Sequence, residues 1–95
     1  MRFEWDEKKN RANFKKHGIL FEIALSVFND PFSLTVTDRM VEHEERFWTI
    51  GRIENLSILV VVHTGYLEED DEVVRIISAR TAAPHERRFY EEAER

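Results

Sequence analysis

The segment LSILVVVHTGYLEEDDEVVRIISAR, residues 56–80, decides the fold of this chain. Its first part, Leu56–Thr64, is the strongest predicted strand of the sequence, and Glu72–Arg80 is a second strand rich in β-branched residues. The polar residues Tyr66–Asp71 between the two are typical of a hairpin loop. Strands with so continuous an apolar content are expected at the centre of a sheet or covered on both faces.

Three further strands are predicted before this hairpin. Alternation of apolar and polar residues indicates strands at Ser33–Asp38 and Arg46–Ile53, with the acidic stretch MVEHEE between them as a connection. A short strand around Phe3–Trp5 begins the chain. We therefore expect an α+β fold with an antiparallel meander of four strands at its core.

Two helices are predicted between the first strand and the meander. Asp6 is a good N-cap and Gly18 a good stop for a helix over Glu7–His17, which has little apolar surface. Residues 19–29 follow as a second helix. Its core-facing stripe is expected to comprise Leu20, Ile23, Ala24, Val27 and Phe28.

A terminal helix completes the chain, opened by Thr81 or Ala83 ahead of Pro84, with Phe89 and Ala93 able to dock on the core. The predicted order is βααββββα, with the sheet packed by the N-terminal helices and flanked by the C-terminal one. Ninety-five residues with 42% hydrophobic content make one domain, residues 1–95.

Composition excludes several classes of protein. The chain has no cysteine, so disulfides and thiolate metal sites are excluded, and its longest apolar run, Ile58–Val62, is too short to span a membrane. Because the N-terminus also lacks the layout of a signal peptide, we expect a soluble, cytoplasmic protein.

The formal charge of −5 argues at first sight against a nucleic-acid partner. However, residues 1–20 contain six Lys or Arg against three acids, whereas Tyr66–Glu72 contains five acids and no base. Charge separated in this way can leave a basic face on an acidic protein, because salt screens charges beyond about 8 Å.

Four polar side chains of the first predicted helix share one stripe, namely Lys9, Asn13, Lys16 and His17. Such a stripe can meet an anion. Spacing alone favours the alternative of a solvated helix face, because most charged helix faces are simply exposed.

Arginines are interleaved with core residues on two strands. Alternation places Arg46 and Arg52 on one side of their strand, and Arg75 and Arg80 on opposite sides of theirs. Their guanidinium groups need a carboxylate, a cleft or a sheet edge. Ion pairs with nearby glutamates and a phosphate-binding surface are equally consistent with this pattern; the candidate partners are Glu42, Glu44 and Glu45.

The terminal helix carries Glu86, Arg87 and Tyr90 at helical spacing. A tyrosine can stack on a base or transfer a proton, and an adjacent arginine can hold a phosphate. A salt-bridged exposed helix is the alternative. The four histidines show no metal-ligand spacing and the three glycines form no phosphate loop, so we predict neither metal nor cofactor.

Three ordered motifs carry a family resemblance: FEWDEKKNRANFKKHGILFEIA at residues 3–24, RFWTIGR at 46–52 and VVRIISARTAAPHERRFYEE at 73–92. Together they resemble the BrnT toxins of bacterial toxin-antitoxin operons, which are related in fold to the RelE ribonucleases. The resemblance implies an endoribonuclease that arrests growth by cutting RNA. It also implies a cognate ribbon-helix-helix antitoxin, through which operator DNA is contacted only indirectly.

The polar positions that match the family are Lys9, Lys16, His17, Arg46, Arg52, Arg80, Glu86 and Arg87. Metal-free cleavage by a 2′-hydroxyl needs a base, an acid and cations at the phosphate. The candidates are His17 or Glu86 as base, Lys16 or Tyr90 as acid, and Arg46 and Arg80 at the phosphate. The remaining expected RNA contacts are Lys9, Asn13, Arg52, Arg75 and Arg87. The alternative function is a non-catalytic interaction module that binds an antitoxin-like partner.

Overall fold

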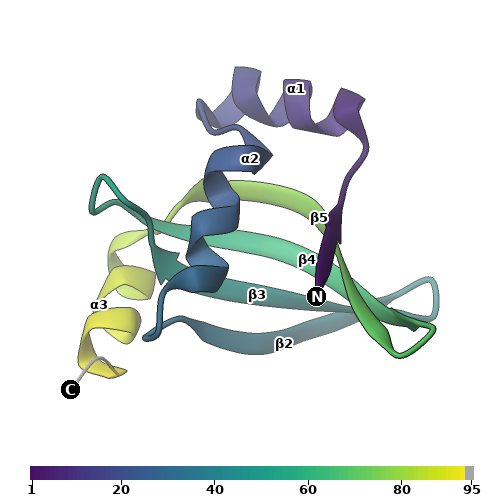
Figure 1. The fold of residues 1–95 in the computed structure, drawn as a ribbon. Coiled ribbons are helices and arrows are strands. Elements are labelled where there is room, and N and C mark those ends of the chain that lie inside the picture. Colours follow the sequence, from purple (N-terminus) through teal and green to yellow (C-terminus); the bar gives the residue numbers. More distant parts are fainter. Residues whose placement is uncertain (94–95) are drawn as a thin grey trace.

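The computed structural model describes residues 1–93 and shows an α+β fold built on one five-stranded sheet (Figure 1). The strand order is β1-β5-β4-β3-β2, and the predicted antiparallel meander forms its larger part. The first strand adds to β5 in parallel, which makes the sheet mixed. The strands are β1 (Arg2–Glu4), β2 (Leu34–Val41), β3 (Glu44–Arg52), β4 (Ile58–Glu68) and β5 (Asp71–Thr81).

The helical elements are α1 (Glu7–His17), α2 (Phe21–Ala24), the 3-10 helix η1 (Leu25–Asn29) and α3 (Pro84–Ala93). The predicted order βααββββα is confirmed, with η1 continuing α2. In the described part of the chain, none of these helices is long and apolar enough to cross a membrane.

The β2–β3 and β4–β5 hairpins turn more tightly than predicted. Glu42 and His43 have φ of 51° and 67°, and Glu69 and Asp70 have φ of 51° and 70°. Positive φ at both central residues gives the two-residue turn whose twist matches that of the strands. The strands therefore continue through most of 40–45 and 66–71, which the sequence had indicated as loops, because cross-strand pairing outweighs their polar composition.

Helices cover the two faces of the sheet unequally (Figure 1). One face, here the α2 face, packs against α2 and η1 in the larger core cluster, which includes Phe21, Val27 and Leu59. The other face, the α3 face, packs against α3. Its core cluster is smaller and includes Tyr90 of α3 together with Ile50 and Val60 of the sheet. Most of the apolar burial is thus on the α2 face.

The second helix differs from its predicted form in both length and register. Its fully buried residues are Phe21, Ala24 and Val27, whereas Leu20 and Ile23 are 37% and 53% exposed. A buried spacing of three residues matches the period of a 3-10 helix rather than an α-helix, which accounts for the change to η1 at Leu25. The predicted stripe was therefore wrong at its first two positions.

The face of α3 also differs from the prediction. Phe89 is 48% exposed and Ala93 is exposed, while Glu86 and Tyr90 are buried. The polar tips of the two buried side chains determine this orientation, because Glu86 binds Arg80 and Tyr90 donates a hydrogen bond to Asp30.

Two buried asparagines hold the weakly amphipathic helix α1. Asn10 Oδ1 accepts the backbone N–H of Phe21 at 2.8 Å. Asn13 Nδ2 donates to the carbonyl oxygens of Ile19 and Ala79, each at 2.9 Å, and its Oδ1 accepts the N–H of Ala79 at 3.1 Å. One side-chain amide therefore pairs with the edge of β5 as a neighbouring strand would, and α1 is fixed there without an apolar face.

Candidate active site

A groove between α1 and β5 brings together polar side chains from both elements. Its volume is about 450 Å³. We call it the α1–β5 groove, and its lining residues are Lys9, Ala12, Asn13, Lys16, His17, Ile77, Ser78 and Arg80. The polar stripe predicted on α1 thus meets one of the predicted arginines, and it does so in a concave site.

A β-bulge in β5 decides which arginines share a face of the sheet. Val62 pairs with Ser78 but His63 pairs with Ile76, so Ile77 is an extra residue. As a result Ile76 and Ala79 both lie in the larger core, and the two arginines that flank this stretch both point to the α3 face. The prediction that Arg75 and Arg80 lie on opposite sides was therefore wrong, because simple alternation does not continue through a bulge.

Arg80 is fixed in the groove by a carboxylate and a ring. Its Nη1 and Nη2 donate to Glu86 Oε1 and Oε2 at 2.7 and 2.9 Å, and its guanidinium carbon lies 5.4 Å from the Trp48 ring centroid. The hydrogen bonds from Arg80 lower the Glu86 pKa to about 2, and the N–H of Ala83 also binds this carboxylate. Glu86 is therefore ionised near neutral pH and orients Arg80, whereas a carboxylate of so low a pKa is a weak proton acceptor.

Arg46 and Arg75 lie farther along the α3 face. Thr64 pairs with Arg75, and the β3–β4 register, continued by one residue, places Arg46 on the other side of Thr64. Arg75 Nη1 donates to Glu4 Oε2 at 3.0 Å. Within residues 1–93, Arg46 Nε and Thr64 Oγ1 are buried atoms with no hydrogen-bond partner.

Arg46 and Arg80 do not converge on one point. Arg80 pairs with Val60, and Val60 with Ile50, four residues from Arg46 on β3. The backbone positions of Arg46 and Arg80 are therefore offset by roughly 13 Å along the strands. Across the strands they are separated by two spacings of about 4.8 Å each. The two arginines can therefore contact different phosphates of one strand, but the backbone does not bring them to the same phosphate.

Tyr90 and Arg52 form a different cluster, which anchors α3. The Tyr90 hydroxyl donates to Asp30 Oδ2, which also accepts the N–H of Arg52, and the Arg52 guanidinium carbon lies 5.5 Å from the Tyr90 ring centroid. Burial alone would raise the Asp30 pKa, but the hydrogen bonds from Tyr90 and the backbone hold it below its ordinary value. Tyr90 is 1% exposed, so its hydroxyl is part of the packing of α3.

The BrnT family model, described as the ribonuclease toxin BrnT of type II toxin-antitoxin systems, matches residues 5–86. The chain belongs to the BrnT family. The chain is similar to the Brucella abortus ribonuclease toxin BrnT, whose crystal structure is known at 1.1 Å resolution. The two sequences are 26% identical, and the two structures superpose with a TM-score of 0.56. The similarity covers 87% of this chain and 97% of the Brucella one. No curated protein matches the chain closely enough to count as a relative.

Family membership places the protein among the ribonuclease toxins of type II toxin-antitoxin systems, so its partner is an antitoxin. The match covers every residue of the α1–β5 groove, from Lys9 to Arg80, and reaches Glu86. The groove is therefore a feature of the region that carries the family match.

The remaining predicted site residues lie outside the groove or have their polar groups engaged within the fold. Asn13 lines the groove, but its amide binds backbone groups, and Arg87 is exposed on α3. In the described part of the chain, no three His, Cys, Asp or Glu side chains are grouped so as to hold a metal ion.

Sequence reasoning did not select Trp48, Thr64 or Ser78, although each lies beside a predicted arginine. For Trp48 a signal was present, because alternation puts it on the same side of β3 as Arg46. Thr64 and Ser78 could be placed only once the strand register was known.

Proposed function

We propose that the protein is an endoribonuclease that cleaves RNA without a metal, by attack of a 2′-hydroxyl on the adjacent phosphate in the α1–β5 groove. The observation that carries this proposal is that Lys16, His17 and Arg80 line one cavity, although they come from different ends of the chain. We also propose that it acts in the cytoplasm, where its substrate is found.

The cations of the groove suit a scissile phosphate. Lys9, Lys16 and Arg80 offer positive charge from two sides. Arg80 has five N–H groups, and Glu86 takes only two of them, so the guanidinium retains donors for a phosphate. Because Glu86 and Trp48 already fix its orientation, little conformational entropy is lost when it binds.

His17 and Lys16 are the proposed proton-transfer residues. The neutral imidazole of His17 accepts the 2′-hydroxyl proton as that oxygen attacks phosphorus, and the Lys16 ammonium protonates the departing 5′-oxygen. One P–O bond forms and one breaks, which yields a 2′,3′-cyclic phosphate and a 5′-hydroxyl. Such proton transfers typically contribute about 10²- to 10⁴-fold to the rate.

Two alternative role assignments lose support from the geometry. Glu86 is a weak base because both its oxygens bind Arg80 and its pKa is about 2. The Tyr90 hydroxyl is committed to Asp30 under α3 and does not line the groove. The proposal therefore assigns the role of base to His17 and the role of acid to Lys16.

The α3 face offers a path for the rest of the RNA strand. Trp48 is half-buried beside Arg80, and its ring can stack on a base. Farther along, Arg46 and Arg75 flank Thr64 and are proposed to hold neighbouring phosphates. The unpartnered Arg46 Nε and Thr64 Oγ1 would gain hydrogen bonds from such a contact.

We further propose that the antitoxin is a ribbon-helix-helix protein and that operator DNA is contacted through it. The support is the three sequence motifs at residues 3–24, 46–52 and 73–92, two of which include groove residues.

A non-catalytic role, in which the groove only grips an acidic segment of the antitoxin, is the second candidate. Arg80 favours it to some degree, because it already binds a carboxylate through two parallel hydrogen bonds. In that case the cations of the groove would receive carboxylates of the partner rather than phosphates.

Cleavage of a fluorescent structured RNA in the presence of EDTA distinguishes the two functions. The wild-type protein is expected to produce cyclic-phosphate ends. His17→Ala should lower kcat/KM by about 10²- to 10⁴-fold because the base is lost. Lys15→Ala is the matched control, since Lys15 is a neighbouring exposed cation of α1 that lines a different cavity.

Arg80→Ala should lower kcat/KM by about 10²- to 10³-fold through lost charge stabilisation. Unchanged cleavage in both His17→Ala and Arg80→Ala would remove the groove as the active site. A wild-type protein that binds its antitoxin but neither cleaves RNA nor stops growth would establish the non-catalytic role.

A further inference from the structure

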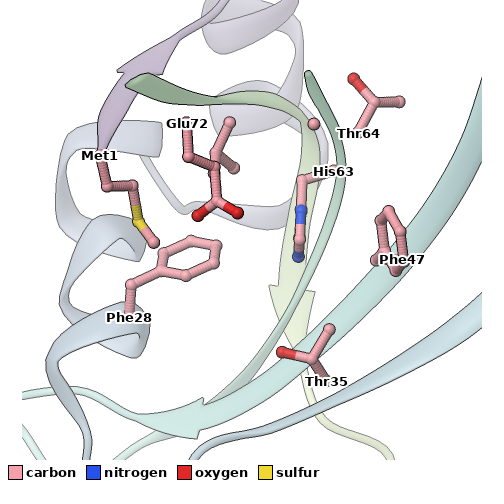
Figure 2. Close-up of a pocket in the computed structure, with 9 residues that line it drawn as sticks. Met1, Phe28, Thr35, Phe47, His63, Thr64 and Glu72 are labelled. Carbon is pink, nitrogen blue, oxygen red and sulfur yellow. The ribbon is translucent and has the colours of Figure 1, made fainter. Parts of the chain in front are cut away.

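A second cavity lies on the α2 face, beneath the β4–β5 hairpin (Figure 2). Its volume is about 230 Å³. We call it the hairpin cavity, and its lining includes Phe28 from η1, Phe47 from β3, His63 from β4 and Glu72 from β5. Its position on the α2 face, under the hairpin tip, separates it from the α1–β5 groove.

His63 presents an unused ring nitrogen in this cavity. The side chain is 7% exposed, and its Nε2 lies 2.7 Å from Thr49 Oγ1, which lies 2.8 Å from Thr35 Oγ1. Its Nδ1 is buried and has no hydrogen-bond partner within residues 1–93. A buried nitrogen without a hydrogen-bond partner is unfavourable, so a ligand that pairs with it gains affinity.

Aromatic rings surround this histidine. Phe47 stacks on the imidazole with a centroid distance of 5.7 Å, and Phe28 meets it edge-on at 5.2 Å. Burial lowers the His63 pKa below its ordinary value, although the Thr64 backbone and the negative charge of Glu72 act in the opposite direction. A neutral imidazole that keeps its proton on Nε2, toward Thr49, leaves Nδ1 as an acceptor.

Glu72 supplies a negative charge at the same cavity. Figure 2 shows its carboxylate directed toward the space between Phe28 and His63. Its neighbours Glu68 and Asp71 pair with Arg2 and the terminal amine, but Glu72 has no hydrogen bond or ion pair to any described residue. An acceptor nitrogen, a free carboxylate and aromatic faces together suit a cation with several donors.

We propose that the hairpin cavity binds an alkylguanidinium group, presented as an arginine side chain by a peptide segment of a protein partner. The planar guanidinium can donate to Glu72 and to His63 Nδ1 at once while it packs against Phe28. The cavity volume of about 230 Å³ is enough for one long side chain. The five acids of 68–72 disfavour anionic ligands such as phosphates.

Binding of acetyl-Gly-Arg-Gly-amide to the tag-free protein tests this proposal, followed by calorimetry and by the ¹⁵N shift of the His63 imidazole. We expect saturable binding with a shift at Nδ1. Glu72→Gln should weaken binding at least tenfold. Glu69→Gln is the matched control, because it makes the same charge change at the hairpin tip outside the cavity, and it should change affinity less than twofold.

Three results would overturn the proposal. The first is equal binding of the citrulline counterpart, which lacks the charge. The second is an equal loss in Glu69→Gln and Glu72→Gln, which would mean that the peptide only senses the acidic tip. The third is butylguanidinium binding more than tenfold tighter than the peptide, which would make this a site for a free small molecule. Neither assay depends on RNA cleavage.

Discussion

The two ends of β5 carry opposite charges. At its C-terminal end Arg80 lines the α1–β5 groove with two lysines of α1, whereas at its N-terminal end Glu72 lines the hairpin cavity. The bulge at Ile77 lies between them. The net charge of −5 therefore predicts the local charge of neither site. The basic and the acidic side chains lie at opposite ends of β5, and each site senses mainly the charges close to it.

The two sites also differ in what holds their walls. In the groove, polar contacts set the geometry: Asn13 ties α1 to Ala79, and Glu86 orients Arg80. In the hairpin cavity, rings from η1 and β3 pack around His63. The loss of a single polar group in the groove should therefore lower the stability of the protein strongly. Acid should do the same, because it protonates the carboxylate that orients Arg80.

Asn13→Ala should have the largest effect. It leaves the N–H and C=O of Ala79 and the C=O of Ile19 without their side-chain partner, at about 1–3 kcal/mol for a buried unsatisfied group. We expect the free energy of unfolding to fall by about 2–4 kcal/mol in urea titrations. Lys9→Ala removes an exposed groove residue of the same helix and should cost less than about 0.5 kcal/mol. Equal stability of the two variants would mean that α1 is not held by its amides.

Glu86→Gln should have an intermediate effect that depends on pH. The Glu86 pKa falls from an ordinary 4.5 to about 2 in the folded protein, so its ionised form contributes up to about 3 kcal/mol. Because the folded pKa is the lower one, this contribution is complete above pH 4.5 and is lost as the pH falls toward 2.

Urea unfolding at pH 7, 4 and 3 measures this contribution. The variant should be less stable by about 1–3 kcal/mol at pH 7 and should approach the wild type in acid. Glu91→Gln, an exposed change on the same helix, should leave the pH profile of the wild type unchanged. A Glu86→Gln profile parallel to that of the wild type at every pH would contradict the assigned role.

The elements themselves were largely predictable from local signals. Asp6 and Gly18 cap the two ends of α1 as expected. The Asp6 carboxylate accepts the N–H of Lys8, and Gly18 adopts φ 72°. Alternation also placed Arg46 and Trp48 on one side of β3. These signals act within a few residues, and the sequence contains them directly.

The relations between distant elements were not predictable in the same way. The bulge at Ile77 follows from the pairing of β4 with β5, and it reversed the expected side of Arg75 relative to Arg80. Likewise Asn13 reads in sequence as one member of a polar stripe, yet its amide binds Ala79, which is 66 residues away. The sequence was thus sufficient to identify the lysines and the arginine of the groove as candidate site residues. Their positions relative to one another depend on the register of the sheet, which the sequence does not contain directly.

Glu4→Gln should have the smallest effect, and it acts on the α3 face between the two sites. Glu4 accepts hydrogen bonds from Arg75 and from the Tyr66 hydroxyl, in a pair too exposed to contribute more than about 1 kcal/mol to stability. Its neutralisation frees the Arg75 charge for a phosphate. RNA affinity at low salt should rise about two- to fivefold, and the slope of log K against log salt should steepen by about 0.7.

Fluorescence anisotropy of a labelled RNA over a salt series measures both quantities. Glu69→Gln again changes the net charge equally but at the acidic tip, so it should leave the slope unchanged. If both variants raise affinity to the same extent, RNA senses only the total charge of the protein. If only Glu4→Gln steepens the slope, RNA follows the arginines of the α3 face, and the charge separation along β5 is what allows an acidic protein to bind it.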